Sequence, residues 1–436
     1  MTGTSGTQGK VLSQREIAVF FFPLLLNVQM MTVSHTLINA ALARQKEFIV
    51  ALAAYSVAWS IQQFFGSTNY QNHLLAVAVV HGRRSFFNAL GYVLIQGITV
   101  SSLVALIAFG PAGPAVLNGL MGLEGEISAQ ALATLGIMFI NPLFVAVRAF
   151  FQGIVIRARR NLLITTATVV RILSLIIFLF LFSPRMSGAP LGAAALVGCV
   201  IVETILMAIF AWRCGLPEDG KEEKSMGEIV RFALPLSISS SLQMSVFLVI
   251  NAILGRLADS ALALASFGVI RSLILLVGGP MRNLQHTCLT LVKSAQDYRV
   301  LLLFWLRTSA AMVLLTTALA FPLNDLFLGS ILGLPSDIRH YIALPLACSA
   351  LFPFFHGATT LLRGYFAQRY MSGQVVKSTL LRVVYLAGLG WVITQWPPAV
   401  PGLVIGLVLF LSSEVVDSLY LRWQRDRFTR WRYSRT

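Results

Sequence analysis

The sequence predicts an all-α integral membrane protein with twelve transmembrane helices in two homologous halves of six. Hydrophobic residues make up 57% of its 436 residues and charged residues only 11%, whereas soluble domains carry about a quarter charged residues. About a dozen apolar stretches reach the roughly 20 residues that cross a bilayer core about 30 Å thick. An internal repeat is the third observation. Strand-like alternation between turns is rare, which argues against a membrane barrel.

The expected spans follow one another with short polar connections, and each is an apolar run of helical length. They are 16–42, 48–78, 85–110, 131–156, 161–183, 189–212, 228–254, 262–292, 299–323, 338–366, 373–396 and 402–422. The stretch 111–130 contains too many Gly and Pro residues to span, and we expect an interfacial loop there.

Lys and Arg residues in the connections are distributed unequally between the two sides of the membrane. The richer side carries Lys10, Arg15, Arg83, Arg84, Arg157, Arg159, Arg160, Arg213, Lys221, Lys224, Lys293, Arg299, Arg369 and six arginines from Arg422 onward. The poorer side carries only Arg44, Lys46, Arg185, Arg256 and Arg339. Because cytoplasmic loops are enriched in Lys and Arg, we expect both termini in the cytoplasm and the protein in the cell (inner or plasma) membrane.

The net charge of +16 follows from this bias and from a basic tail that faces anionic lipid headgroups. The lipid bilayer is therefore the expected partner. Nucleic acid is not, because no soluble domain is available to bind it.

The chain repeats itself with an offset of 212 residues, which later becomes 211. The first expected span of each half shares the pattern Glu-Ile-x-x-Phe-x-x-Pro-Leu, which begins at Glu16 and at Glu228. The same spans end in Ile-Asn-Ala-x-Leu-x-Arg, with Asn39 and Arg44 matching Asn251 and Arg256. Ungapped recurrence of Pro, Asn and Arg indicates a duplication.

The duplication divides the chain into segments with separate roles. They are a cytoplasmic N-terminus (1–15), a first half (16–213), a cytoplasmic linker (214–227), a second half (228–422) and a basic cytoplasmic tail (423–436). Six spans is an even number, so both halves enter the membrane in the same direction. An axis along the membrane normal should relate them, with a cavity between them near the midplane, and rocking of the halves would give alternating access.

The two halves resemble the MATE-like multidrug/oligosaccharidyl-lipid/polysaccharide (MOP) exporter superfamily, in which each half begins with a proline-containing helix. More closely, the chain is similar to the progressive ankylosis (ANK) family. The similarity rests on Leu52-Ala53-x-Tyr55-x-x-Ala58-x-Ser60 followed by Phe64-Phe65, and on Phe352-Pro353 with Leu362, Gly364, Ser378 and Leu381-Arg382. The resemblance implies export of anions such as pyrophosphate, nucleotides or citrate-like carboxylates.

Ionisable residues at membrane depth cost free energy, so each needs a partner or a function. Arg171 recurs as Arg382, and Glu203 recurs as Glu414. Arginine and glutamate on neighbouring helices could form one ion pair in each half, Arg171 with Glu203 and Arg382 with Glu414. A structural role in tying helices together and a role in substrate or proton coupling both remain open for these pairs.

Three cationic positions occur in the second half only. Under the repeat, Arg271, Arg282 and His286 align with Trp59, Tyr70 and Leu74. Gly278-Gly279-Pro280 lies between them, and Gly and Pro often interrupt transporter helices. If Pro280 begins a new half-helix, its free N–H groups would favour an anion. We therefore expect an anion site there, with Arg282 and His286 reaching lipid headgroups as the alternative.

Polar residues of the first two spans could line the same cavity. His35, Asn39 and Gln62 are candidates, and hydrogen bonds that pack helices together are the alternative role for each. Beyond Glu16 at its first position, the first span contains no carboxylate, which counts against exchange of a proton or sodium ion for a cationic drug.

The sequence indicates no enzyme, because it contains no phosphate-binding loop, no metal-ligand cluster and no nucleophile with a nearby base. No cofactor is expected. The leading hypothesis is a secondary exporter of small organic or phosphate-bearing anions. The alternatives are a lipid-linked pyrophosphate flippase and a cationic multidrug antiporter. A proton or sodium ion as the coupling ion, and the oligomeric state, remain open.

Overall fold

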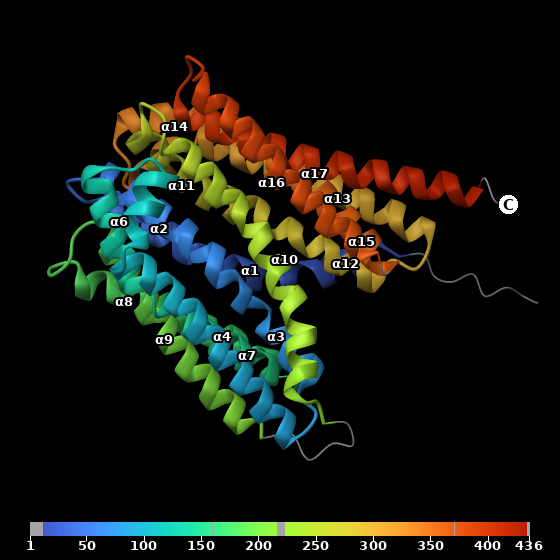
Figure 1. The fold of residues 1–436 in the computed structure, drawn as a ribbon. Coiled ribbons are helices and arrows are strands. Elements are labelled where there is room, and N and C mark those ends of the chain that lie inside the picture. The colour runs from blue at the N-terminus through green and yellow to red at the C-terminus, as the bar shows by residue number, and fades with distance from the viewer. Residues whose placement is uncertain (1–11, 159, 216–222, 370, 434–436) are drawn as a thin grey trace, which may run out of the picture.

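A computed structural model describes residues 12–158, 160–215, 223–369 and 371–433, and these residues form helices and turns without a strand. Twelve transmembrane helical units follow one another along the chain (Figure 1). The first six are α1 (Gln14–Leu42), α2–η1–α3 (Phe48–Gly66, Ser67–Gln71, Asn72–Val79), α4 (Arg83–Phe109), α6–α7 (Gly125–Met138, Asn141–Arg157), α8 (Asn161–Phe182) and α9 (Ala189–Arg213). The second six are α10 (Met226–Leu254), α11–η3–α12 (Ser260–Gly278, Gly279–Arg282, Asn283–Leu291), α13 (Ala295–Ala320), α14–α15 (Ser336–Ser349, Phe352–Gln368), α16 (Ser372–Gln395) and α17 (Gly402–Tyr433).

Length and apolar composition confirm a multi-pass membrane protein. Ten helices of the described chain could cross a membrane, and an eleventh span results if α6 and α7, which are bent by 40° relative to each other, count as one. The 29-residue helix α1 completes the predicted architecture. The predicted fold class of twelve helices in two halves is therefore confirmed.

Two predicted segments differ from the structure. The expected loop 111–130 contains the short helix α5 (Ala112–Pro114), a π-helical segment η2 (Ala115–Leu120) and the start of α6. A second π-helical segment, η4 (Asp325–Ile331), occupies the equivalent connection of the second half. The expected tail 423–436 begins inside α17, which continues to Tyr433. Part of the expected linker, residues 216–222, lies outside the described chain, as do residues 1–11 of the expected N-terminus.

The two halves form two lobes that meet at one end and diverge toward the other (Figure 1). The N-terminal lobe contains α2 to α9, and the C-terminal lobe contains α11 to α17. We call the meeting region, with the α1–α2 and α10–α11 turns, the closed end. The last residues of α9 and α17 and the first residues of α1 and α10 lie at the opposite, open end.

Helices α1 and α10 each reach from their own lobe to the other. Ser13 and Glu16 form a capping box at the start of α1, as Ser225 and Glu228 do at the start of α10, which fixes where both helices begin. Near its start, α1 packs on the C-terminal lobe, where the rings of Phe21 and Phe304 are 5.3 Å apart. The first half of α10 lies against α3 and α4 of the N-terminal lobe.

The apolar core is shared at the closed end and divided at the open end. One large cluster joins α2 of the first lobe to α11 of the second through residues such as Ala54, Val57, Val269 and Ile270. Separate clusters form around Phe150 in the first lobe and around Leu301 in the second. The lobes are therefore packed together only where they converge.

Candidate functional site

A small cavity lies between the lobes, where α1, α2 and α11 meet. Its volume is about 40 Å³, which corresponds to one or two water molecules. It is lined by Thr32, His35, Asn39, Tyr55, Ser56, Trp59, Gly268, Arg271, Ser272 and Leu275. The structure thus brings together three of the predicted binding residues: His35, Asn39 and Arg271.

Arg271 is the cation of this cavity. Its side chain is buried, with 6% of its surface exposed, and its guanidinium carbon lies 3.7 Å from the centre of the Phe247 ring. No ion pair joins it to a carboxylate within the described chain. A buried charge without a counterion is costly, and a bound anion would offset that cost.

His35 and Trp59 form the equivalent contact in the first half. Their rings are 4.1 Å apart, and the repeat aligns them with Phe247 and Arg271. The Tyr55 hydroxyl lies 3.3 Å from Nδ1 of His35. The two halves therefore place equivalent side chains in contact, but only the second half has a permanent cation in the pair.

Two asparagines connect the lobes beside the cavity. Asn39 Nδ2 donates to Ser272 Oγ over 3.0 Å, and Asn251 Nδ2 donates to the Ser56 carbonyl over 3.0 Å. Under the repeat, the bond of Asn251 to the Ser56 carbonyl corresponds to a longer contact of 3.5 Å from Asn39 Nδ2 to the Gly268 carbonyl. Within the described residues, the bond of Asn39 to Ser272 occurs in one half only, because Ser272 aligns with Ser60.

The N-terminal lobe holds a buried cluster of two arginines and one glutamate. Arg171 Nη1 lies 3.5 Å from Glu203 Oε2, and Arg148 Nη1 lies 3.1 Å from Glu203 Oε1. Arg171 also donates to Ser34 Oγ of α1 over 3.0 Å. The structure thus brings the predicted pair together, and it adds Arg148, which we had not assigned to it. Arg148 has no cationic counterpart in the second half, where Thr359 occupies its position.

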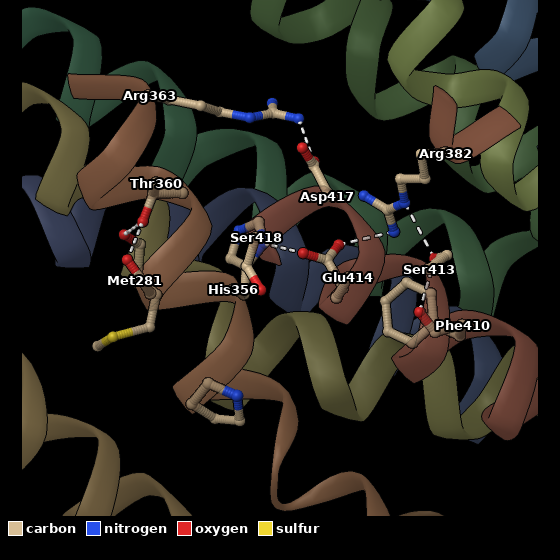
Figure 2. A network of polar contacts seen from close by, with 12 residues as sticks. Met281, His356, Thr360, Arg363, Arg382, Phe410, Ser413, Glu414, Asp417 and Ser418 are labelled. Carbon is tan, nitrogen blue, oxygen red and sulfur yellow. Dashed lines mark hydrogen bonds and ion pairs between the residues drawn. The ribbon is translucent and has the colours of Figure 1, made fainter. Parts of the chain in front are cut away.

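The C-terminal lobe has a different cluster around the equivalent pair (Figure 2). Arg382 Nη2 lies 2.7 Å from Glu414 Oε1, and His356 Nδ1 lies 3.3 Å from the other oxygen of Glu414. Arg363 and Asp417 form a second ion pair of 2.7 Å nearby. Sequence reasoning missed His356 and the Arg363–Asp417 pair because neither occurs in both halves.

The central region has a net positive charge. Its buried arginines outnumber its buried carboxylates by two in the described chain: Arg148, Arg171, Arg271, Arg363 and Arg382 against Glu203, Glu414 and Asp417. This excess favours negative charge between the lobes.

The remaining predicted residues are not at this cavity. Arg282 and His286 are exposed on η3 and α12, and Arg282 is 11 positions from Arg271, which is about 16 Å along a helix. Gly278 packs against Phe352 and Pro353. Gln62 is buried in α2 and does not line the cavity.

The α-helix is interrupted at the predicted place, where α11 ends at Gly278 and Pro280 lies in η3, but no free half-helix N-terminus results. The chain there is a short 3-10 segment, η3, inside one 32-residue span. The N–H of Gly279 bonds to the Leu275 carbonyl, so the helix continues into the segment without the free N-terminus that we expected. A matching segment, η1 at Ser67–Gln71, bends the first half at the same place without any proline. Gly278 and Gly279 therefore belong to a bend that both halves share.

A larger groove lies between α4 and α10. Its volume is about 510 Å³, and its walls are mainly apolar. Ile95, Leu234 and Ile238 line it and are exposed. On its polar side, Gln96 Nε2 donates to Ser237 Oγ over 3.0 Å.

Known proteins resemble this fold. A family described as polysaccharide biosynthesis protein matches residues 83–277, and no curated protein matches the sequence significantly. An inward-facing multidrug resistance MATE transporter of the MOP superfamily is 16% identical, with a TM-score of 0.65 over 99% of this chain and 98% of that one. The lipid II flippase MurJ in an inward closed conformation is 13% identical, with a TM-score of 0.69 over 94% and 87% of the two chains.

A MOP superfamily transporter from Pyrococcus furiosus, described as having a binding pocket of reverse polarity, is 14% identical. Its TM-score is 0.55 over 98% of this chain and 99% of that one. This chain has the fold of MOP superfamily transporters. Membership of the progressive ankylosis family stays a prediction.

Proposed function

We propose that the protein is a secondary transporter that carries an anionic substrate between its lobes by alternating access. The observation that carries this proposal is Arg271, a buried cation that lines the cavity between the lobes without a carboxylate partner in the described chain. A carboxylate or phosphate group would supply the missing counterion. The fold supports transport, because the MATE and MurJ structures that share it are a transporter and a flippase.

The charge around the cavity favours an anion over a cation. None of the cavity-lining residues is acidic, and the central clusters leave an excess of positive charge. A cationic drug would therefore find no counterion there, which disfavours the multidrug antiporter.

The lysine and arginine bias supports an orientation with the open end and both termini in the cytoplasm of the cell membrane. The structure would then receive substrate from inside, as an exporter does. The cavity of about 40 Å³ is large enough for one charged group. The rest of a citrate-like carboxylate, pyrophosphate or nucleotide would extend between the lobes toward the open end.

A lipid-linked pyrophosphate is the second candidate, favoured by the groove between α4 and α10. Its apolar walls and exposed isoleucines suit a lipid tail that remains in the bilayer while the charged head enters between the lobes. The match to a polysaccharide biosynthesis family supports the same candidate.

Efflux from liposomes tests the proposal. Purified protein would be reconstituted with labelled citrate, pyrophosphate or ATP inside, and wild type would be compared with Arg271→Met. We expect efflux of at least one anion and a loss of roughly tenfold or more in the variant, because one charge interaction of a few kcal/mol is removed. Arg185→Met is the matched control, because Arg185 is an exposed arginine away from the cavity.

Two outcomes distinguish the candidates. Translocation of a fluorescent polyprenyl pyrophosphate, with no efflux of any soluble anion, would favour the lipid-linked substrate. Anion efflux that Arg271→Met leaves unchanged would contradict the proposed site.

A further inference from the structure

Arg44 joins the two lobes at the closed end. It lies in the turn between α1 and α2, where Nη1 donates to the Ala40 carbonyl over 2.7 Å. Its Nη2 donates across the lobe boundary to the carbonyls of Ser330 and Ile331, over 3.1 and 2.7 Å. One guanidinium thus holds the end of α1 against the end of η4.

Arg256 makes the reciprocal contact. It lies in the turn between α10 and α11, and its Nη2 donates to the Gly119 carbonyl of η2 over 2.8 Å. The repeat aligns Arg44 with Arg256 and Gly119 with Ser330. The two arginines therefore bind equivalent segments of opposite lobes. Unrelated surface contacts would not follow the repeat in this way.

The backbone of each π-helical segment leaves the required acceptors free. After η2, the N–H groups of residues 121–123 bond to the carbonyls of Val116, Leu117 and Asn118. The next carbonyl, that of Gly119, is therefore available to Arg256. In η4, the corresponding bonds go to Phe327, Leu328 and Gly329, which leaves Ser330 and Ile331 for Arg44. Unpaired carbonyls at the end of a helical segment attract a cation.

A glycine after each segment lets the arginine approach. Gly122 and Gly333 have φ values of 67° and 76°, a conformation that residues with a Cβ rarely adopt. A Cβ at Gly122 would lie 2.5 Å from Cγ of Arg256, and one at Gly333 would lie 2.9 Å from Cγ of Arg44. Each arginine stem thus lies directly over the glycine of the opposite lobe.

We propose that Arg44 and Arg256 are paired latches that hold the closed end shut, and that both must release before the central cavity opens to that side. The proposal rests on alternating access but not on the identity of the substrate. Both side chains are exposed, so water can replace the carbonyls and each latch is weak. Weak, reversible contacts suit a gate that opens during every cycle.

Distance measurements between spin labels test the latches. Labels at Lys46→Cys and Asp337→Cys, both exposed at the closed end, would be placed in a background with Cys199, Cys214, Cys288 and Cys348 replaced by alanine. Arg44→Met and Arg256→Met keep the apolar stem and remove the donors. We expect the population with the longer distance to rise about threefold in each single variant and about tenfold in the double variant, as for independent exposed charge contacts.

Two comparisons control the result. Arg185→Met removes an exposed arginine whose side chain makes no hydrogen bond or ion pair within the described residues, and it should leave the distances unchanged. Lysine at positions 44 and 256 should give an intermediate shift, because a single ammonium cannot reproduce the forked contact. An unchanged distribution in the folded double variant would overturn the proposal.

Hydrogen–deuterium exchange of the chain with its native cysteines provides a second measurement if the cysteine-free background does not fold. Faster exchange in 48–66 and 260–278 of the double variant would support a gate, because these helices join the lobes. Faster exchange confined to 115–124 and 325–335 would overturn it, because only the local contact would have loosened. Neither measurement needs substrate. The latch proposal can therefore be refuted while Arg271-dependent anion transport is observed, and the transport proposal can be refuted while the latches are observed.

Discussion

The two halves of the molecule share one scaffold but differ in the chemistry it carries. Around α2, the rings of His35 and Trp59 are tilted relative to each other with their centres 4.1 Å apart, and around α11 the centre of the equivalent Phe247 ring lies 3.7 Å from the guanidinium carbon of Arg271. The asparagine contacts to the carbonyls of Gly268 and Ser56, the 3-10 segments and the arginine contacts at the closed end recur in both halves. Duplication therefore preserved the backbone contacts that hold the lobes together, while the residues that could meet a substrate diverged.

The buried charged residues also combine a shared arrangement with different neighbours in the two lobes. Arg171 with Glu203 and Arg382 with Glu414 occupy equivalent positions, yet their neighbours differ. In the first lobe a second arginine shares the one glutamate, whereas in the second lobe His356 and a separate Arg363–Asp417 pair surround it. Four pairs of variants test whether the two lobes share the same scaffold and differ in their buried charges.

Removal of the shared glutamate should have the largest effect. Glu203→Gln leaves two buried arginines without a carboxylate, and we expect a loss of about 3–5 kcal/mol in the free energy of unfolding. Glu414→Gln leaves only Arg382 unpaired, so its loss should be smaller. Denaturant unfolding in detergent micelles would measure both, with the exposed Glu124→Gln as control. Equal losses would show that the two clusters do not differ in charge balance.

Removal of the unpaired cation should have the opposite sign. Arg271→Met replaces a buried charge that has no carboxylate partner in the described chain. The free energy of unfolding should therefore rise by about 1–2 kcal/mol. Arg382→Met should destabilise the protein, because it leaves Glu414 without its arginine. The same unfolding experiment compares them, and destabilisation by Arg271→Met would mean that its stacking on Phe247 is structural.

Alanine at the turn glycines should act equally in both halves. Gly122→Ala and Gly333→Ala each place a Cβ in a left-handed conformation, which costs about 1–2 kcal/mol. Melting temperatures of the two variants should fall by similar amounts. A fall in only one of them would show that the two turns are not equivalent, and Gly119→Ala, where a Cβ meets no neighbour, is the control.

The crossed asparagines should have the smallest effect. Asn39→Ala and Asn251→Ala each remove one amide that donates to the other half, and its main hydrogen bond contributes about 1 kcal/mol. Unfolding measurements should give similar losses for both. A much larger loss for one asparagine would break the pseudo-twofold relation at the centre of the molecule.

The spans and the repeat could be predicted because both depend on local composition and on residues that recur at a fixed offset. The π-helical segments and the bend at Ser67–Gln71 could not, because packing against the other lobe decides the backbone there. Arg282 and His286 were wrongly grouped with Arg271 from their nearness in sequence, whereas the helical rise carries them toward the open end. Arg148 and His356 were missed as partners because contacts between helices leave no pattern in a single sequence.

The polarity of the transported substrate tests the central claim most directly. Liposomes that contain wild type or Arg271→Met would be loaded with labelled citrate and the cationic dye ethidium, and efflux of both would be followed together. We expect citrate or another anion to leave only with wild type, and ethidium to be retained. Ethidium efflux that persists in Arg271→Met, with every anion retained, would contradict this claim.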